Sequence, residues 1–106
     1  MPVLFRERIP LQGWEETVWE FHLQEGMLVT GTVFEENHNW LKIFLFDREN
    51  YLRKRQGNVY HYWGGSGISG FNYNLRVPRT GTYYLLVGHN DWFGRAEIAR
   101  INLDYQ

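Results

Sequence analysis

The stretch Phe71-Asn72-Tyr73-Asn74-Leu75-Arg76-Val77 decides the fold class of this sequence. Its apolar and polar residues alternate, so the four apolar side chains lie on one face of an extended chain and the polar ones on the other. This pattern is typical of a β-strand with one buried face. Residues 78–81, Pro-Arg-Thr-Gly, then supply turn chemistry, and residues 82–87 are apolar again. We expect the two segments to form a hairpin.

Similar segments, separated by Gly, Pro, Asn and Asp, recur about every ten residues, and helix signals are missing. Residues 40–46 are apolar on both faces apart from Lys42, which predicts a central strand covered on both sides. The remaining expected strands are residues 3–9, 19–23, 27–33, 59–63 and 96–105. The sequence therefore predicts an all-β fold, an antiparallel, jelly-roll-like β-sandwich of about eight strands formed as a single domain by residues 1–106.

Three segments depart from simple alternation. Ala96 and Ile98 are out of phase with the apolar residues that follow, and an extra residue near Ala99-Arg100 would repair the phase, so we predict a β-bulge there. The charged residues 48–56 are expected to form a hairpin excursion. The glycine-rich residues 64–70 are expected to be a flexible connection that crosses between the sheets, because a phosphate-binding loop needs a following helix.

Composition narrows the class of protein. The chain has 106 residues, which is enough for one core, and 43% of them are hydrophobic and 18% aromatic, unlike a disordered chain. A net charge of -1 argues against a nucleic-acid partner, because phosphate-backbone binding depends on a basic surface. The absence of cysteine rules out disulfides and thiolate metal sites.

The sequence shows no targeting or membrane-spanning pattern. Charged residues occur within residues 1–8, where a signal peptide would need its apolar stretch, and no run approaches the roughly 20 apolar residues of a membrane span. We therefore expect a cytoplasmic protein without membrane insertion.

A family resemblance rests on residues 71–105. An alternating strand there is followed by Val77-Pro78-x-Thr80-Gly81-x-Tyr83-Tyr84-Leu85-Leu86-Val87, a polar turn and a final strand. This cadence resembles the ending shared by GOLD domains and bacterial pre-peptidase C-terminal domains. Together with Tyr62-Trp63-Gly64-Gly65 it is also similar to a small bacterial domain of unknown function that is sometimes fused to TIR domains. The resemblance covers about half of the chain and implies a β-sandwich that binds or accompanies rather than catalyses.

Residues that could carry catalysis or bind metal are not grouped in the usual ways. The histidines, at positions 22, 38, 61 and 89, form no i, i+2 or i, i+4 pair, and the only serines, Ser66 and Ser69, lie in the glycine-rich connection. Asp47 to Asn50 and Asn90-Asp91 offer oxygen ligands, but both look like ordinary turns rather than calcium loops. We expect neither metal nor other cofactor.

Paired carboxylates give no catalytic site either. Glu15-Glu16 and Glu35-Glu36 are adjacent in sequence, so on a strand their side chains point to opposite faces and cannot share a substrate. We interpret both pairs as solvated residues of turns or edges. The sequence thus predicts a protein that is not an enzyme.

The aromatic content is the feature of this sequence that best indicates a binding function. Five Trp and seven Tyr exceed what a core of this size must bury, so some rings should be exposed near turns, although several could simply plug the ends of the sandwich. The candidate ligand-binding residues are Asn39, Trp40, His61, Trp63, His89, Asn90, Asp91 and Trp92. We expect their three loops to lie near one another and to form one functional surface.

Three functions remain open. The first hypothesis is a non-catalytic interaction domain that contacts a protein partner or another copy of itself. The second is a carbohydrate-binding module that uses the turn tryptophans as a stacking platform. The third, a metal-dependent or other hydrolase, lacks a recognisable catalytic set.

Overall fold

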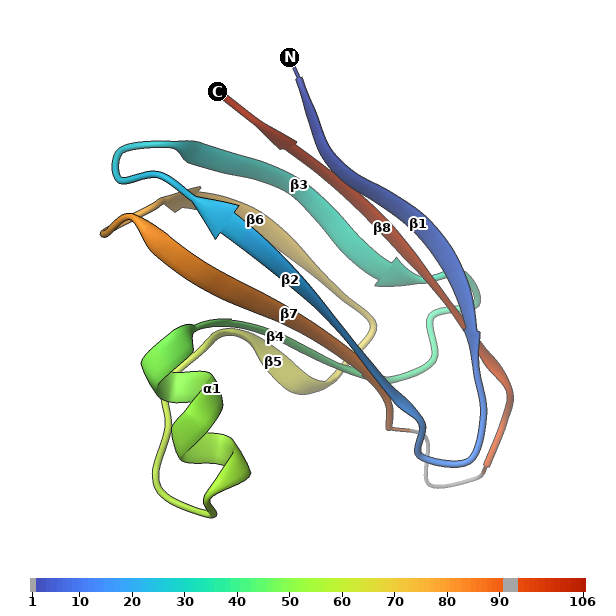
Figure 1. Cartoon of the computed structure of the whole chain (residues 1–106). Coiled ribbons are helices and arrows are strands. Elements are labelled where there is room, and N and C mark those ends of the chain that lie inside the picture. The colour runs from blue at the N-terminus through green and yellow to red at the C-terminus, as the bar shows by residue number, and fades with distance from the viewer. Residues whose placement is uncertain (1, 91–93) are drawn as a thin grey trace.

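The computed structural model of the chain describes residues 2–90 and 94–106, and within them it contains eight strands and one helix (Figure 1). In chain order the elements are β1 (Val3–Leu11), β2 (Glu16–Leu23), β3 (Leu28–Glu35), β4 (Leu41–Asp47), α1 (Arg48–Arg55), β5 (Trp63–Ile68), β6 (Gly70–Arg76), β7 (Gly81–His89) and β8 (Glu97–Tyr105). The strands form an antiparallel β-sandwich, which confirms the predicted fold class.

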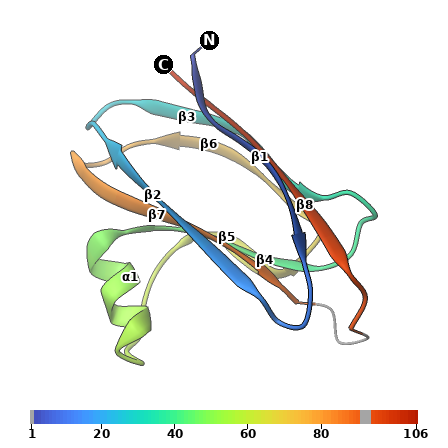
Figure 2. The same cartoon turned by 45° about the vertical axis from the view of Figure 1, so that its right-hand side comes forward.

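Two four-stranded sheets pack face to face, as Figure 2 shows from the side. One sheet has the strand order β1-β8-β3-β6 and the other β2-β7-β4-β5. This order, in which most neighbours are distant in sequence, is that of a jelly roll. The first and last strands are antiparallel neighbours, and the amide of Tyr105 donates to the carbonyl of Pro2 at 3.0 Å. The two termini therefore lie side by side (Figure 1).

The core lies between the sheets and follows the predicted alternation. In β6 the inward Tyr73 is buried and its polar neighbours Asn72 and Asn74 are exposed. In β4 both faces are covered: Ile43 faces the core between the sheets, whereas Phe46 faces outward beneath α1. The prediction that residues 40–46 include a central, two-sided strand is confirmed for β4.

The prediction of a hairpin excursion over residues 48–56 is wrong, because Arg48 to Arg55 form helix α1. The Asp47 carboxylate caps the helix by accepting the amide of Asn50 at 2.9 Å. The ring of Tyr51 then stacks on Tyr84 of β7 at 4.1 Å, which fastens the helix to the sheet. No residue of α1 is fully buried, so the helix lacks the apolar periodicity by which a sequence reveals a helix.

The connections around β5, β6 and β7 also differ from the sequence-based predictions. The turn at residues 78–81 joins strands of different sheets, so β6 and β7 are not a hairpin. The glycine-rich segment is mostly strand: only Ser69 separates β5 from β6, although the chain does cross between the sheets there. Of the expected strand at residues 59–63, only Trp63 is in a strand.

The predicted β-bulge near Ala99-Arg100 is absent. Ala99 pairs with Ile9 and Arg100 with Arg8, and the register of β8 shows no shift at this point. The phase is regular because Glu97, a charged residue, faces the interior while Ile98 faces outward. The prediction was wrong because it assumed that the apolar Ile98, rather than the charged Glu97, faces the interior.

Two glycines let neighbouring strands approach closely. Gly31 has φ +125°, and a Cβ atom there would lie 2.0 Å from the carbonyl oxygen of Asn102 in β8. Gly64 has φ +141°, and a Cβ atom would lie 1.7 Å from the carbonyl oxygen of Ile43 in β4. Each obstacle is backbone, so the clash cannot be relieved by rotating a side chain.

We expect Gly31→Ala to destabilise the protein by about 3 kcal/mol or more, since the strands would have to separate. The matched control is Gly57→Ala, where φ is +75° but no atom lies within 4 Å of the added Cβ. Gly57→Ala should lower the free energy of unfolding only by the backbone strain, about 1–2 kcal/mol. Urea unfolding of both variants measures the difference, and equal losses would contradict the close-approach argument.

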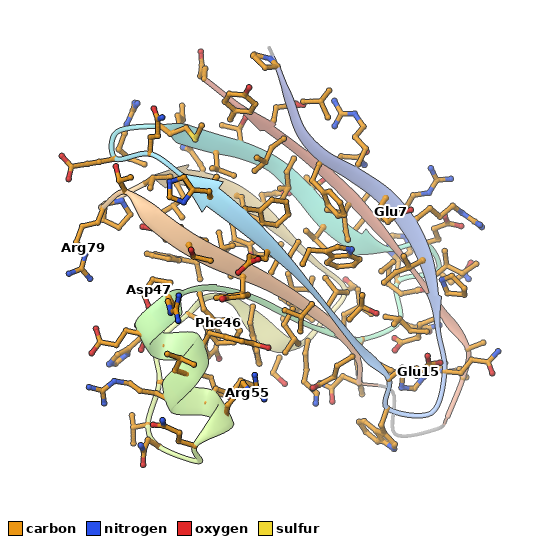
Figure 3. The ribbon with its side chains drawn as sticks, in the orientation of Figure 1. Glu7, Glu15, Phe46, Asp47, Arg55 and Arg79 are labelled. Atoms are coloured by element: carbon orange, nitrogen blue, oxygen red, sulfur yellow. The ribbon has the colours of Figure 1, made fainter. Side chains whose placement is uncertain are left out.

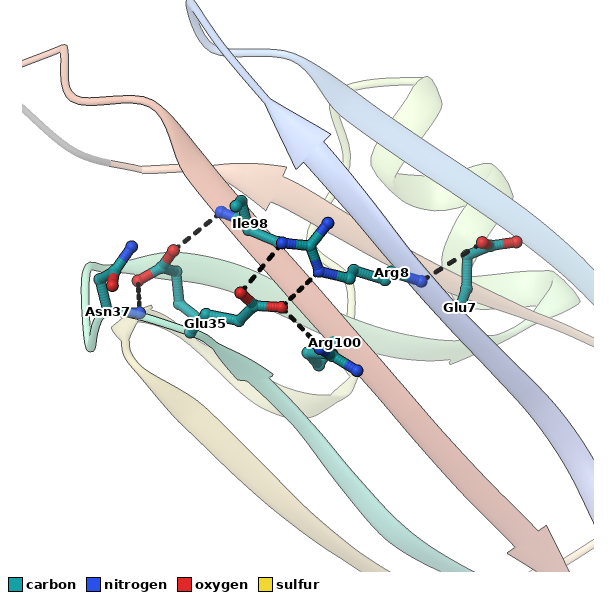
Figure 4. Close-up of polar contacts among 7 residues, drawn as sticks. Glu7, Arg8, Glu35, Asn37, Ile98 and Arg100 are labelled. Atoms are coloured by element: carbon teal, nitrogen blue, oxygen red, sulfur yellow. Dashed lines mark hydrogen bonds and ion pairs between the residues drawn. The ribbon is translucent and has the colours of Figure 1, made fainter.

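A charge network crosses the outer face of the β1-β8-β3 sheet (Figure 4). Glu36 follows β3 and accepts from Arg8 of β1 at 2.7 Å and from Arg100 of β8 at 2.5 Å. Hydrogen bonds from Arg8 and then Arg100 lower the pKa of Glu36 from 4.5 to about 2. The carboxylate therefore stays ionised well into acid.

This pKa shift predicts a pH-dependent contribution to stability. A carboxyl whose pKa is lower in the folded protein stabilises it above the unfolded pKa, near 4.5, and that contribution is lost as the pH falls toward about 2. The melting temperature of the wild type should therefore fall more steeply than that of Glu36→Gln between these pH values. Parallel melting curves for the two proteins would contradict the role of the network.

Candidate functional site

The candidate ligand-binding residues that the structure describes lie at two ends of strand β4. Leu41 at the start of β4 pairs with His89, so the segments around Trp40 and His89 lie close together. Trp63 pairs instead with Leu45, near the other end of the strand. The structure thus brings together two of the three loops and places the loop with His61 and Trp63 elsewhere. Asp91 and Trp92 lie outside the described residues.

At the start of β4, the candidate residues His89 and Asn90 make hydrogen bonds within the protein. His89 is fully buried, and its Nε2 lies 2.6 Å from the carbonyl oxygen of Arg95. Asn90 donates its amide to Glu97 at 3.1 Å and its side chain to Ser66 at 3.2 Å. Trp40, by contrast, is 45% exposed. The binding role of this group stays a prediction.

The prediction that Glu35 is a solvated residue of a turn or edge is wrong. It is fully buried, not solvated as expected, because it takes the inward position at the end of β3. Its Oε1 accepts the amides of Asn37 at 2.7 Å and Asn39 at 2.8 Å, and its Oε2 accepts the amide of Ile98 at 2.8 Å. Figure 4 draws the bonds to Asn37 and Ile98. All these bonds are to backbone, so the carboxylate is structural.

The other end of β4 carries a concave site, which we call the α1 cleft. It lies between the start of α1, the segment that leads into β5 and the turn between β6 and β7, and its volume is about 250 Å³. Its walls are Asp47, Asn50, His61, Tyr62, Trp63, Pro78 and Arg79. Figure 3 shows Asp47 at the start of the helix and Arg79 at the tip of the neighbouring turn.

The polar groups of the α1 cleft are positioned by short bonds. Asp47 Oδ1 accepts both the backbone and side-chain nitrogens of Asn50 at 2.9 Å, while Oδ2 faces Arg79 Nη2 at 3.7 Å. Asn50 Oδ1 in turn accepts the amide of His61 at 2.8 Å, which fixes the return segment beside the helix. An anion and a cation thus border the cleft together, and the side chain of Arg79 is 74% exposed.

The aromatic groups are held just as firmly. Tyr62 is 39% exposed, and its ring packs on Phe44 with 4.1 Å between the centroids. Trp63 is half-buried, 6.3 Å from the ring of Tyr83. Tyr83 donates its hydroxyl to the carbonyl of Arg79 at 2.7 Å, and burial raises the pKa of Tyr83, so the hydroxyl remains a donor that anchors the turn.

A second hollow of about 420 Å³ adjoins the first and shares Asp47 and Arg79 with it. Its other walls are Arg48, Glu49, Thr80, Gly81, Thr82 and Tyr83. The ion pair therefore borders both hollows.

The described part of the chain holds no cluster of side chains that could bind a metal ion. Within residues 2–90 and 94–106, His, Asp and Glu side chains form no group of three or more suited to a metal ion. No helix in these ranges is long and apolar enough to span a membrane. The cleft offers hydrogen bonds and aromatic faces, which are the means of binding a polar ligand.

The sequence matches no protein-family model, and a search of curated proteins found no match either. The resemblance to GOLD and pre-peptidase C-terminal domains therefore stays a prediction, and inferences about function rest on geometry.

Sequence reasoning named His61 and Trp63 but missed the rest of the α1 cleft. Asp47 and Asn50 have the sequence pattern of an ordinary turn, and Arg79 that of a turn between strands, yet all three line the cleft. A usable signal was present, since Asp followed three residues later by a polar residue is a pattern of helix N-termini.

The two ends of β4 predict different outcomes for the two tryptophans. Trp63→Ala should lower the free energy of unfolding by about 2–4 kcal/mol, because the ring packs against the core. Trp40→Ala should lower the free energy of unfolding by less than about 1 kcal/mol, because Trp40 is 45% exposed and does not belong to either core cluster. Denaturant unfolding of both variants measures the contrast, and a larger loss for Trp40→Ala would reverse the assignment.

Proposed function

We propose that this chain is a non-catalytic binding module that holds a carbohydrate in the α1 cleft. The observation that carries the proposal is that two aromatic residues, Tyr62 and Trp63, and the Asp47–Arg79 ion pair line one concave site. Sugars present both an apolar ring face, which packs on aromatic rings, and hydroxyl edges, which need donors and acceptors together. The cleft supplies both kinds of contact.

Size and charge support the same ligand class. A volume of 250 Å³ holds roughly eight water molecules at about 30 Å³ each, and one sugar ring with its hydroxyls would displace them. The neighbouring hollow leaves room for the chain to continue past the ion pair. Because Asp47 and Arg79 offset each other's charge, a neutral ligand is favoured over an anion.

The number of carboxylates in the cleft favours binding of a carbohydrate over its hydrolysis. Glycoside hydrolysis generally uses a pair of carboxyl groups that flank the scissile bond. The 250 Å³ compartment is lined by one carboxylate, Asp47, which already caps the helix. Glu49 borders the second hollow, but it lies 3.2 Å from Arg53 on the helix surface.

A protein partner, the first hypothesis from the sequence, has weaker support. A standard interface covers about 800 Å² on each partner, with apolar anchors near its centre. Among the residues that the structure describes, the exposed large apolar side chains come from several segments of the chain, at Val3, Trp14, Val18, Trp40, Leu52, Val59 and Tyr62. A concave polar site is therefore the better-supported binding surface.

Titration with a panel of neutral oligosaccharides tests the proposal. We expect saturable binding by calorimetry with a change in tryptophan fluorescence from Trp63, and we expect Tyr62→Ala and Arg79→Gln each to weaken binding by about tenfold, or ~1.4 kcal/mol. Trp40→Ala, at the other end of β4, is the matched control and should bind like the wild type. A panel without any binder, or an unchanged affinity in Tyr62→Ala, would overturn the assignment.

A further inference from the structure

A second surface, separate from the α1 cleft, is formed by the last turn of α1 and the loop after it. We call it the basic tip and define it as Leu52, Arg53, Lys54, Arg55 and Val59. Residues 48–59 hold four of the chain's 11 Lys and Arg and one of its 12 acidic residues, a net charge of +3. Seven basic and eleven acidic residues remain elsewhere, a net charge of -4. The protein is therefore electrically polarised.

The basic tip also exposes aliphatic surface. Val59 is 79% exposed, the largest value among the large apolar side chains of the described residues, and Leu52 is 40% exposed. Figure 1 shows α1 and its return segment projecting beyond the sheet on which the helix packs. Cations and aliphatic side chains thus share one projecting feature.

Backbone hydrogen bonds give the basic tip a defined shape. The amide of Gln56 donates to the carbonyl of Leu52 at 3.1 Å, and the amide of Asn58 donates to the carbonyl of Arg53 at 2.9 Å. These bonds wrap the loop around the end of the helix as far as Asn58, the residue before Val59. Leu52, Arg53 and Asn58 also line the same shallow hollow.

We propose that the basic tip docks on an anionic membrane surface, with the aliphatic side chains entering the headgroup region. Lysine and arginine near an anionic leaflet are attracted to its lipids, and buried aliphatic surface adds to this attraction. Leu52 and Val59 supply the aliphatic surface that adds to the electrostatic attraction. The Glu49–Arg53 pair is exposed on the helix surface and weak, so it leaves Arg53 available to lipid phosphates.

Shape and composition favour a membrane over the other anionic partners. A projecting tip of a few residues is smaller than a standard protein interface. Single-stranded nucleic acid is bound in grooves lined by aromatic rings, whereas the exposed apolar side chains of this tip, Leu52 and Val59, are aliphatic. A lipid surface requires neither a matching groove nor a large flat face.

The charge separation also fixes the orientation of the docked protein. The acidic remainder of the chain is repelled by an anionic surface, so the sandwich stands away from it. The α1 cleft lies beside the first turn of α1, a helix about 12 Å long at 1.5 Å per residue, and the basic tip lies at its last turn. Docking would therefore leave the cleft open to solvent.

Vesicle co-sedimentation tests this inference. The protein is mixed with vesicles of phosphatidylcholine alone or of equimolar phosphatidylcholine and phosphatidylserine, at low and at physiological salt. We expect binding to the anionic vesicles that weakens as salt is added. Arg53→Glu/Lys54→Glu should reduce the partition coefficient at least about tenfold, and Leu52→Ser/Val59→Ser should reduce it without any change in charge.

The matched control is Arg6→Glu/Arg76→Glu, which makes the same change in net charge on the other sheet and should lower binding much less. Equal losses in the tip and control variants, or no dependence on phosphatidylserine, would overturn the proposal. Binding to duplex RNA or to polyglutamate through the tip, without vesicle binding, would overturn it as well. Because the tip variants leave the α1 cleft intact, oligosaccharide binding should be unchanged in them, so the two proposals fail independently.

Discussion

The buried carboxylate of Glu35 is the interaction on which the arrangement of the strands depends. It accepts backbone amides from the segment that carries the chain from β3 to β4, in the other sheet, and from Ile98 at the beginning of β8. Hydrogen bonds to a charged group contribute about 1.5–3 kcal/mol each, and a buried amide left without a partner costs a similar amount. One side chain thus fixes a crossover between the sheets and the register of a central strand.

Local alternation was enough to predict the sandwich because most inward positions of the strands are apolar. It failed where the interior holds a charge: Glu97 faces inward and Ile98 outward, so the apolar pattern of β8 suggested a bulge that is absent. It failed again at α1, which depends on the Asp47 cap and on stacking between Tyr51 and Tyr84 rather than on an apolar stripe. Neither contact produces a periodic pattern of apolar residues in the sequence.

The candidate site was only partly predictable for a related reason. Aromatic excess pointed to residues near turns, and His61 and Trp63 do line the α1 cleft. Arg79 reaches the same cleft only because the turn after β6 crosses to the other sheet, a connection that the sequence suggested was a hairpin. His89 was named from its neighbours, but its inward position in β7 places it in the interior. Contacts between distant turns depend on strand order, which alternation does not encode.

The adjacency of the first and last strands has a mechanical consequence. Both chain ends lie at the same end of the antiparallel pair β1 and β8, whose hydrogen bonds run across the strands. Tension applied to the two ends would load these bonds one at a time, as in a zipper, instead of shearing them together. The edge strand β1 would peel away first at low force, while the opposite sheet, with α1 packed on it, would carry little of the load.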